Sequence, residues 1–253
     1  MNEIRYDNLS LDGKVGFLDE GHKYVHLERP DLKFTSVTTL IAKYKEKFDA
    51  EKVARECVAN EKSKYFGMDW REVALNWQEY GASCAAKGTE MHQYGEDEFN
   101  MKAYCEDLLN KRTPLFIPDN PKAKHVAAAI EEIYKKGYQL AKTELLMYSL
   151  DQAIAGQSDI ILKKKVFGTS EYNYMIYDWK FLSKKIQRKS FYSKKGGYKM
   201  MTGPFKYLMD CNWIHYSIQL ALYQTLSGDP GKVTEKVLLI VMDDGYELVP
   251  AYP

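Results

Sequence analysis

The chain has 253 residues, of which 45% are hydrophobic and 28% are charged, and its net charge is +1. This is the composition of a globular protein with a sizeable core, and it excludes a chain dominated by disorder. The longest apolar runs are far shorter than the ~20 residues that a membrane-spanning helix needs, so no membrane contact is expected. Because the net charge is close to zero, any site for a polyanion must come from local clustering of basic residues.

The N-terminal segment, Met1 to Asp7, contains acidic side chains and no apolar stretch. We therefore expect neither a secretory signal nor a transit peptide, and a cytoplasmic protein. A compact chain rich in tyrosine and lysine suits a bacterial or phage-infected cell. The four cysteines, at positions 57, 84, 105 and 211, include no C-x-x-C pair. Their spacing argues against a zinc ribbon and against a disulfide framework.

In chain order, the first predicted element is a strand or hairpin that begins near Lys23. It is followed by a helix that Ser36 or Thr38 can cap. A helical pattern then covers residues 50–99, with a break predicted at Gly81. The N-terminal part of the chain is therefore expected to be largely helical.

Prolines at positions 114, 118 and 121 predict a loop, after which the apolar residues of Ala123 to Lys136 recur at helical spacing. Beyond this helix the apolar period changes from about 3.6 to about 2 residues. The change predicts three strands, at 143–148, 156–162 and 172–180. Gly168-Thr169-Ser170 is a good hairpin turn between the last two. A basic loop, a helix over about 209–226 and a strand over 236–242 complete the predicted order.

This order predicts a mixed α/β (α+β) fold in which helices flank a mixed central sheet. We expect a strand and helical region over residues 1–135 and a core over 136–253, joined in one continuous domain.

Two acidic residues and a lysine on neighbouring strands carry the chemistry. Asp159 opens one predicted strand and Asp178 lies near the end of its hairpin partner, so the two carboxylates can meet at the same end. Lys180 follows Asp178 by two residues, which places both side chains on one face of the sheet. Carboxylate oxygens suit Mg²⁺ or Mn²⁺, as phosphoryl-transfer chemistry requires. The pattern predicts a site for one or two such ions with a lysine beside them.

The same residues carry a family resemblance. Gly156-Gln157-Ser158-Asp159 with Asp178-Trp179-Lys180 resembles the signature of the PD-(D/E)xK nuclease superfamily. Gly88 to His92 resembles the G-x-x-x-H motif of its RecB-like branch, and Gln219 to Tyr223 resembles that branch's Q-x-x-x-Y helix. The segment Ser36 to Leu40 is similar to one in phage exonucleases and the mitochondrial genome maintenance exonuclease of this branch.

The resemblance implies a restriction-endonuclease-like core and roles for individual residues. His92, Asp159 and Asp178 would bind metal, helped by the backbone carbonyl of Trp179, and Lys180 would be the catalytic lysine. Glu144 lies in the strand where many relatives place a further acid. Gln219 and Tyr223 would steady the site or the DNA strand. No iron–sulfur cluster is expected, because only Cys211 lies late in the chain.

Basic residues concentrate between Lys180 and Lys206, and we expect this segment to hold the phosphate backbone of a nucleic acid. The residues concerned are Lys184, Lys185, Arg188, Lys189, Lys194, Lys195 and Lys199. A solvated loop is the structural alternative.

The sequence thus predicts a metal-dependent deoxyribonuclease, by resemblance an exonuclease, acting in DNA processing, recombination or repair. The alternatives are a structure-specific endonuclease, a catalytically inactive or partner-dependent nucleic-acid binder of the same fold, and an accessory protein whose acids are incidental. With no helicase motif in the chain, a helicase, recombinase or single-strand-binding partner would be a separate protein.

Overall fold

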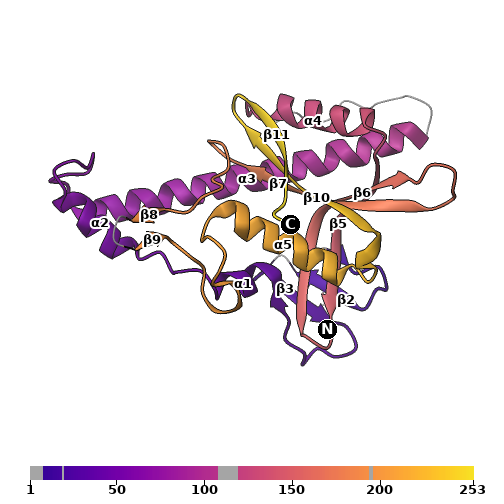
Figure 1. The fold of residues 1–253 in the computed structure, drawn as a ribbon, viewed down its shortest axis with the longest axis horizontal. Coiled ribbons are helices and arrows are strands. Elements are labelled where there is room, and N and C mark those ends of the chain that lie inside the picture. Colours follow the sequence, from indigo (N-terminus) through magenta and orange to yellow (C-terminus); the bar gives the residue numbers. More distant parts are fainter. Residues whose placement is uncertain (1–7, 19, 108–118, 194–195) are drawn as a thin grey trace.

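A computed structural model of the chain describes residues 8–18, 20–107, 119–193 and 196–253 (Figure 1). The predictions made for Met1 to Asp7 and for the prolines at 114 and 118 lie outside these ranges. The remainder forms a mixed sheet with helices on both faces, as the change of apolar period predicts.

The central sheet has the strand order β11-β10-β7-β6-β4, with β5 also paired to β6. Its strands are β4 (Thr35–Ser36), β5 (Gln139–Ser149), β6 (Ile154–Lys165), β7 (Tyr172–Phe181), β10 (Val233–Met242) and β11 (Gly245–Pro250). β7 runs parallel to β10 and antiparallel to β6, which makes the sheet mixed. The predicted strands and the β6–β7 hairpin are confirmed. β11 follows β10 through a tight turn and is an element that the sequence patterns did not indicate.

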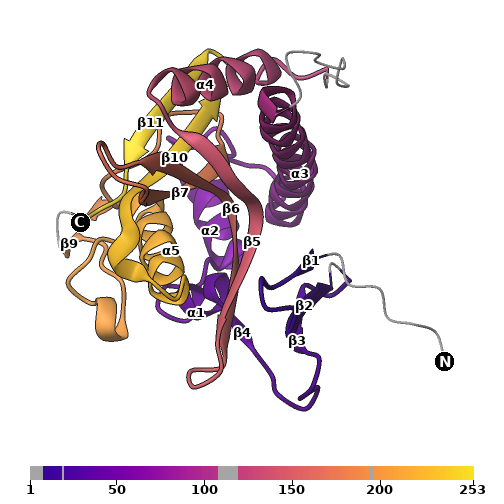
Figure 2. The same ribbon diagram turned by 90° about the vertical axis from the view of Figure 1, so that its right-hand side faces the viewer.

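Two hydrophobic layers cover the sheet. On one face, α3 (Trp70–Asp107) and α4 (Ala123–Lys135) pack on side chains that include Ile160, Tyr177 and Trp179. On the other face, α1 (Val37–Ala42) and α5 (Asn212–Leu226) pack on Ile161, Ile176 and Leu238. Figure 2 shows α3 and α5 on opposite sides of the strands. Alternate residues of β6 and β7 therefore face different helices, as the strand period requires.

The helix α3 continues through Gly81, where a break was predicted, so that prediction is wrong. A glycine in a helix costs about 1 kcal/mol relative to alanine, which the neighbouring turns absorb. The N-terminal part of α3 projects beyond the sheet with α2 (Ala50–Ala59) beside it (Figure 1). Ser36 is the residue that caps α1, because its hydroxyl accepts a hydrogen bond from the backbone N–H of Thr39.

Short elements complete the fold. A three-stranded antiparallel sheet of β1 (Asn8–Leu9), β2 (Val15–Leu18) and β3 (Lys23–His26) packs against β5 and β6. Four others lie between β7 and β10: β8 (Tyr192–Ser193), β9 (Gly197–Tyr198), η1 (Gly203–Phe205) and η2 (Pro230–Lys232). Within the described ranges, no helix has the length and apolarity needed to span a bilayer.

Candidate active site

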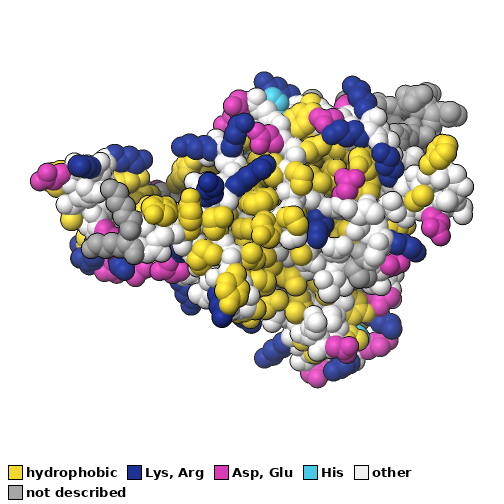
Figure 3. All heavy atoms as spheres, viewed as in Figure 1, with side chains coloured by type: hydrophobic (Ala, Val, Ile, Leu, Met, Phe, Trp, Pro, Cys, Tyr) yellow, Lys and Arg dark blue, Asp and Glu magenta, His cyan; other side chains and the backbone are white. Residues whose placement is uncertain are grey.

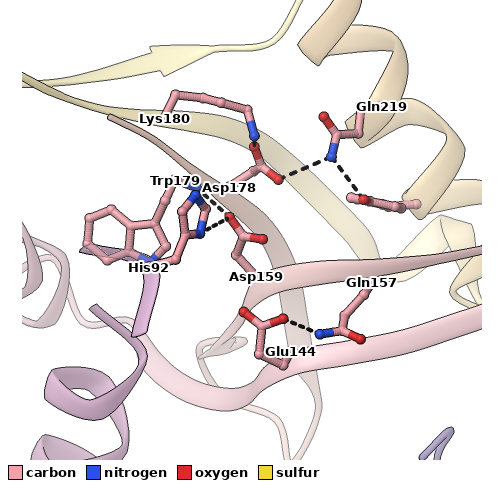
Figure 4. A network of polar contacts seen from close by, with 9 residues as sticks. His92, Glu144, Gln157, Asp159, Asp178, Trp179, Lys180 and Gln219 are labelled. Carbon is pink, nitrogen blue, oxygen red and sulfur yellow. Dashed lines mark hydrogen bonds and ion pairs between the residues drawn. The ribbon is translucent and has the colours of Figure 1, made fainter. Parts of the chain in front are cut away.

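The candidate site lies where β6 and β7 separate. Their pairing ends at Ile160 and Tyr177, and Asp159 and Asp178 are the next residues on each strand. The backbone N–H of Trp179 donates to Oδ2 of Asp159 over 2.8 Å, which holds the two strands together beyond the last pair. Asp159 lies within β6 and does not open the strand as predicted, because β6 extends back to Ile154 to pair with β4 and β5. The strands thus bring both acids together at their point of divergence (Figure 4).

Lys180 forms an ion pair with Asp178 on the face of the sheet that α5 covers. Asp178 is only 1% exposed, and burial together with the charge of Asp159 raises its pKa to about 6. Burial acts to lower the pKa of Lys180, but the carboxylates of Asp178 and Asp159 outweigh it and raise that pKa above its ordinary value. The ring of Tyr216 lies 4.8 Å from the ammonium nitrogen. Lys180 is therefore held as a cation.

Glu144 joins the cluster from β5. The β5–β6 register pairs Thr143 with Ile160 and Leu145 with Ser158, which sets Glu144 opposite Asp159. Burial and the charge of Asp159 raise the pKa of Glu144 to about 8. The amide of Gln157 donates to its carboxylate. The backbone φ of Glu144 is +46°, an uncommon conformation for a residue other than glycine, and such strain concentrates at functional sites.

His92 reaches the site from α3. Its Nδ1 lies 3.4 Å from Oδ2 of Asp159, and its ring packs edge-on against Phe181. Burial, and then the charge of Lys180, lower its pKa to about 4, so the imidazole is neutral at pH 7 and keeps a lone pair for a ligand bond. Glu96, one turn further on, accepts a hydrogen bond from the hydroxyl of Thr143, which precedes Glu144 in β5. This contact joins α3 to the strand that carries Glu144.

A glycine sets how closely α3 approaches the sheet. A Cβ atom at Gly95 would lie 2.9 Å from Cε2 of Trp179, whose side chain is 1% exposed. By contrast, a Cβ atom at Gly88 would meet nothing within 4 Å. Packing against Trp179 therefore requires glycine at position 95, about one turn after His92. It does not require glycine at position 88, which belongs to the sequence motif.

Gln219 and Tyr223 face the acids from α5 and are both buried, so they are not the polar rim of that helix. The amide of Gln219 donates to the hydroxyl of Tyr223 over 2.9 Å and lies 3.5 Å from Oδ1 of Asp178. The ring of Tyr223 fits over Gly156, where an added Cβ would meet Cε1 of the ring at 2.6 Å. Only glycine at position 156 lets α5 come this close to β6.

A pocket of about 330 Å³ opens onto part of this cluster, and Asp178 and Lys180 lie behind its wall. Its wall includes His92, Glu144, Asp159, Gln219 and Tyr223. The N-terminal sheet and its β2–β3 turn add Phe17, His22 and Tyr24 to the wall, and no motif had pointed to these residues.

The basic loop lies elsewhere. Lys184, Lys185, Arg188 and Lys189 are exposed, and none belongs to the pocket wall. Lys185 pairs with Glu247, and the guanidinium of Arg188 lies over the ring of Trp213. Figure 3 shows the face of the molecule that is turned to the viewer in Figure 1. Hydrophobic side chains gather over its middle, with lysine and arginine side chains beside them. Lys194 and Lys195 lie outside the described residues.

The donor atoms of the site are carboxylate oxygens and one imidazole nitrogen. In the part of the chain that the structure describes, no three His, Cys, Asp or Glu side chains are arranged so that they could hold a metal ion as they stand. Lys180 and Gln157 contact the carboxylates of Asp178 and Glu144 instead. Even so, three acids face one lysine, of which Asp178 is buried and Glu144 and Asp159 are half-buried, and removal from solvent is the main cause that raises their pKa values. Oxygen donors with a neutral imidazole are chemically suited to Mg²⁺ or Mn²⁺.

No protein-family model matches the chain, and no curated protein matches its sequence.

Proposed function

We propose that this protein is a nuclease that uses Mg²⁺ or Mn²⁺ to hydrolyse phosphodiester bonds in DNA, and that its sheet is a restriction-endonuclease-like core. The observation that supports this is the convergence of Glu144, Asp159, Asp178, Lys180 and His92 from four different elements (Figure 4). Exonuclease action on DNA ends is the preferred form, on the resemblance of the sequence motifs.

Asp159 and Asp178 would hold the ion, with His92 as a nitrogen ligand. A bound ion supplies a Lewis acid for the phosphate oxygens and lowers the pKa of a water molecule. Lys180, kept charged by its two carboxylate neighbours, orients the attacking water and offsets negative charge that builds on the phosphate. Its raised pKa makes it an electrostatic group and not the proton acceptor.

Glu144 lies at the pocket wall and keeps its proton near neutral pH in the metal-free protein, so its carboxylate could receive a proton only after a bound ion had displaced that one. Gln219 keeps Asp178 in place from α5, and the hydroxyl of Tyr223 in turn accepts the amide hydrogen bond that fixes Gln219. These contacts hold the acids in position without any substrate.

The test is incubation with linear DNA labelled at the 5′ or the 3′ end and with closed circular DNA, with and without Mg²⁺ or Mn²⁺. Asp178→Ala is the control for contaminating nucleases. Metal-dependent loss of linear DNA with circles spared would support the exonuclease and give its polarity, and cut circles would indicate an endonuclease. If neither substrate is cut in any metal, the proposed function is wrong.

A further inference from the structure

A second groove, of about 670 Å³, opens beside the active-site pocket. It lies between the β2–β3 hairpin and the segment that leads into α1. His22, Tyr24 and Ser36 line both hollows, so the groove and the pocket adjoin. A chain-like ligand lying in the groove would therefore lead into the acidic cluster.

The groove is basic. Lys23, Lys33 and Lys43 line it, and no acidic residue does. All three are exposed, and none forms an ion pair with another residue of the described ranges. Lys185 and Lys199 of the basic loop, in contrast, are already paired with acids. The positive charge of the groove is thus available to an anionic ligand.

The groove also presents an aromatic ring at its junction with the pocket. The exposed imidazole of His22 packs edge-on against Phe17, with ring centroids 4.9 Å apart, and against Tyr24 at 6.3 Å. The backbone φ of His22 is +50°, so the ring is carried on a strained turn that holds it over these neighbours. A supported ring with an open face is a platform on which an unpaired base can stack.

Lysines that track a backbone beside rings that accept bases are the combination that single-stranded nucleic acid requires. A duplex keeps its bases stacked inside the helix, so it would use the lysines but not the ring. We infer that this groove binds a single-stranded segment of nucleic acid, with the three lysines on its phosphates and a base on His22, and leads it into the active-site pocket. The delivery of the strand into the active-site pocket rests on the proposed function, whereas the binding of single-stranded nucleic acid in the groove does not.

The test measures binding in EDTA, where cleavage is absent. Fluorescence anisotropy would follow a short labelled oligothymidylate and a duplex of the same length over a range of salt concentrations. Replacing Lys23, Lys33 and Lys43 together by alanine should flatten the salt dependence on the single strand by about two units, since each phosphate contact contributes about 0.7. The matched control replaces three exposed lysines of α4 and β6, Lys124, Lys135 and Lys165, with the same change in net charge.

If the two triple variants lose affinity equally, or if wild type prefers the duplex, the inference is overturned. Thermal melting of each variant establishes that it is folded. Loss of single-strand binding only in the groove variant supports the inference, even if the protein cleaves DNA in no metal. The binding experiment therefore distinguishes failure of this inference from failure of the proposed function.

The ring is tested separately by His22→Ala and His22→Phe, which share the same backbone strain. Alanine should weaken single-strand binding roughly tenfold, because stacking on one ring is worth about 1–3 kcal/mol per base, and phenylalanine should restore it. Equal affinities for wild type and both variants would exclude His22 as a stacking platform.

Discussion

Raising the pH from 6.5 to 8 should destabilise the metal-free protein, because Glu144 keeps a proton that the unfolded chain has already released. Its folded pKa is about 8, whereas the ordinary value is 4.5. The folded state therefore binds more protons than the unfolded state in this window, and its free energy of unfolding falls as the pH rises. One proton corresponds to about 1.4 kcal/mol per pH unit, so the fall is about 2 kcal/mol over the window.

Two other groups of the site, Asp178 and His92, act mainly at lower pH. Asp178, with a pKa of about 6, has released most of its proton by pH 6.5. His92, whose pKa is lowered to about 4, costs stability only as the pH falls below its ordinary value. Burial also raises the pKa of Asp159, beside Glu144, so the window from 6.5 to 8 reports on this pair of acids.

Urea denaturation at several pH values, in EDTA, measures this slope. Glu144→Gln should flatten it, and replacing the exposed Glu56 by glutamine should leave it unchanged. Saturating Mn²⁺ should oppose or reverse this dependence of stability on pH, because the ligands must lose their protons to bind the ion. At a concentration of 100 times its Kd, the ion adds about 2.7 kcal/mol to the free energy of unfolding. A wild-type protein whose stability is constant or rises over this window without metal would refute the account of the buried acids.

Three further predictions concern single residues. Lys180→Ala should lower the cleavage rate at least about 100-fold while Mn²⁺ binding by calorimetry persists, and wild-type cleavage would remove the lysine from the mechanism. His92→Ala should weaken Mn²⁺ affinity about 10- to 100-fold in the same titration, and an unchanged affinity would reduce the imidazole to a packing group. Gly95→Ala should destabilise the fold relative to Gly81→Ala by about 1–3 kcal/mol in urea, because only the first meets the Trp179 ring; equal stability would contradict the close approach of α3.

Much of the sheet could be predicted because β5, β6 and β7 are long and follow a clear alternation. The same alternation placed Asp178 and Lys180 on one face, which the structure confirms. β11 was missed although Asp244-Gly245 follows the apolar run of β10 and is a hairpin signal; the turn residues are Asp243 and Asp244. β1 and β4 are two residues each, too short for any period to appear.

The rest of the site depends on contacts that no local pattern encodes. Glu144 faces Asp159 only through the register of β5 on β6, and its positive φ arises in that context. Gln157, read only as part of a motif, holds the Glu144 carboxylate. His22 reaches the pocket because the N-terminal sheet packs onto β5 and β6. This long-range contact cannot be predicted from a histidine in a hairpin turn.

The long helix α3 also has a mechanical consequence. If it pivots as a rigid rod where Gly95 meets Trp179, its first residue, Trp70, lies ~38 Å from the pivot and His92 lies ~4.5 Å from it. By the lever ratio, a displacement of ~3 Å at the tip then moves the imidazole by ~0.4 Å. A contact made at the projecting end of α3 would therefore displace the His92 side chain far less than it displaces the helix tip.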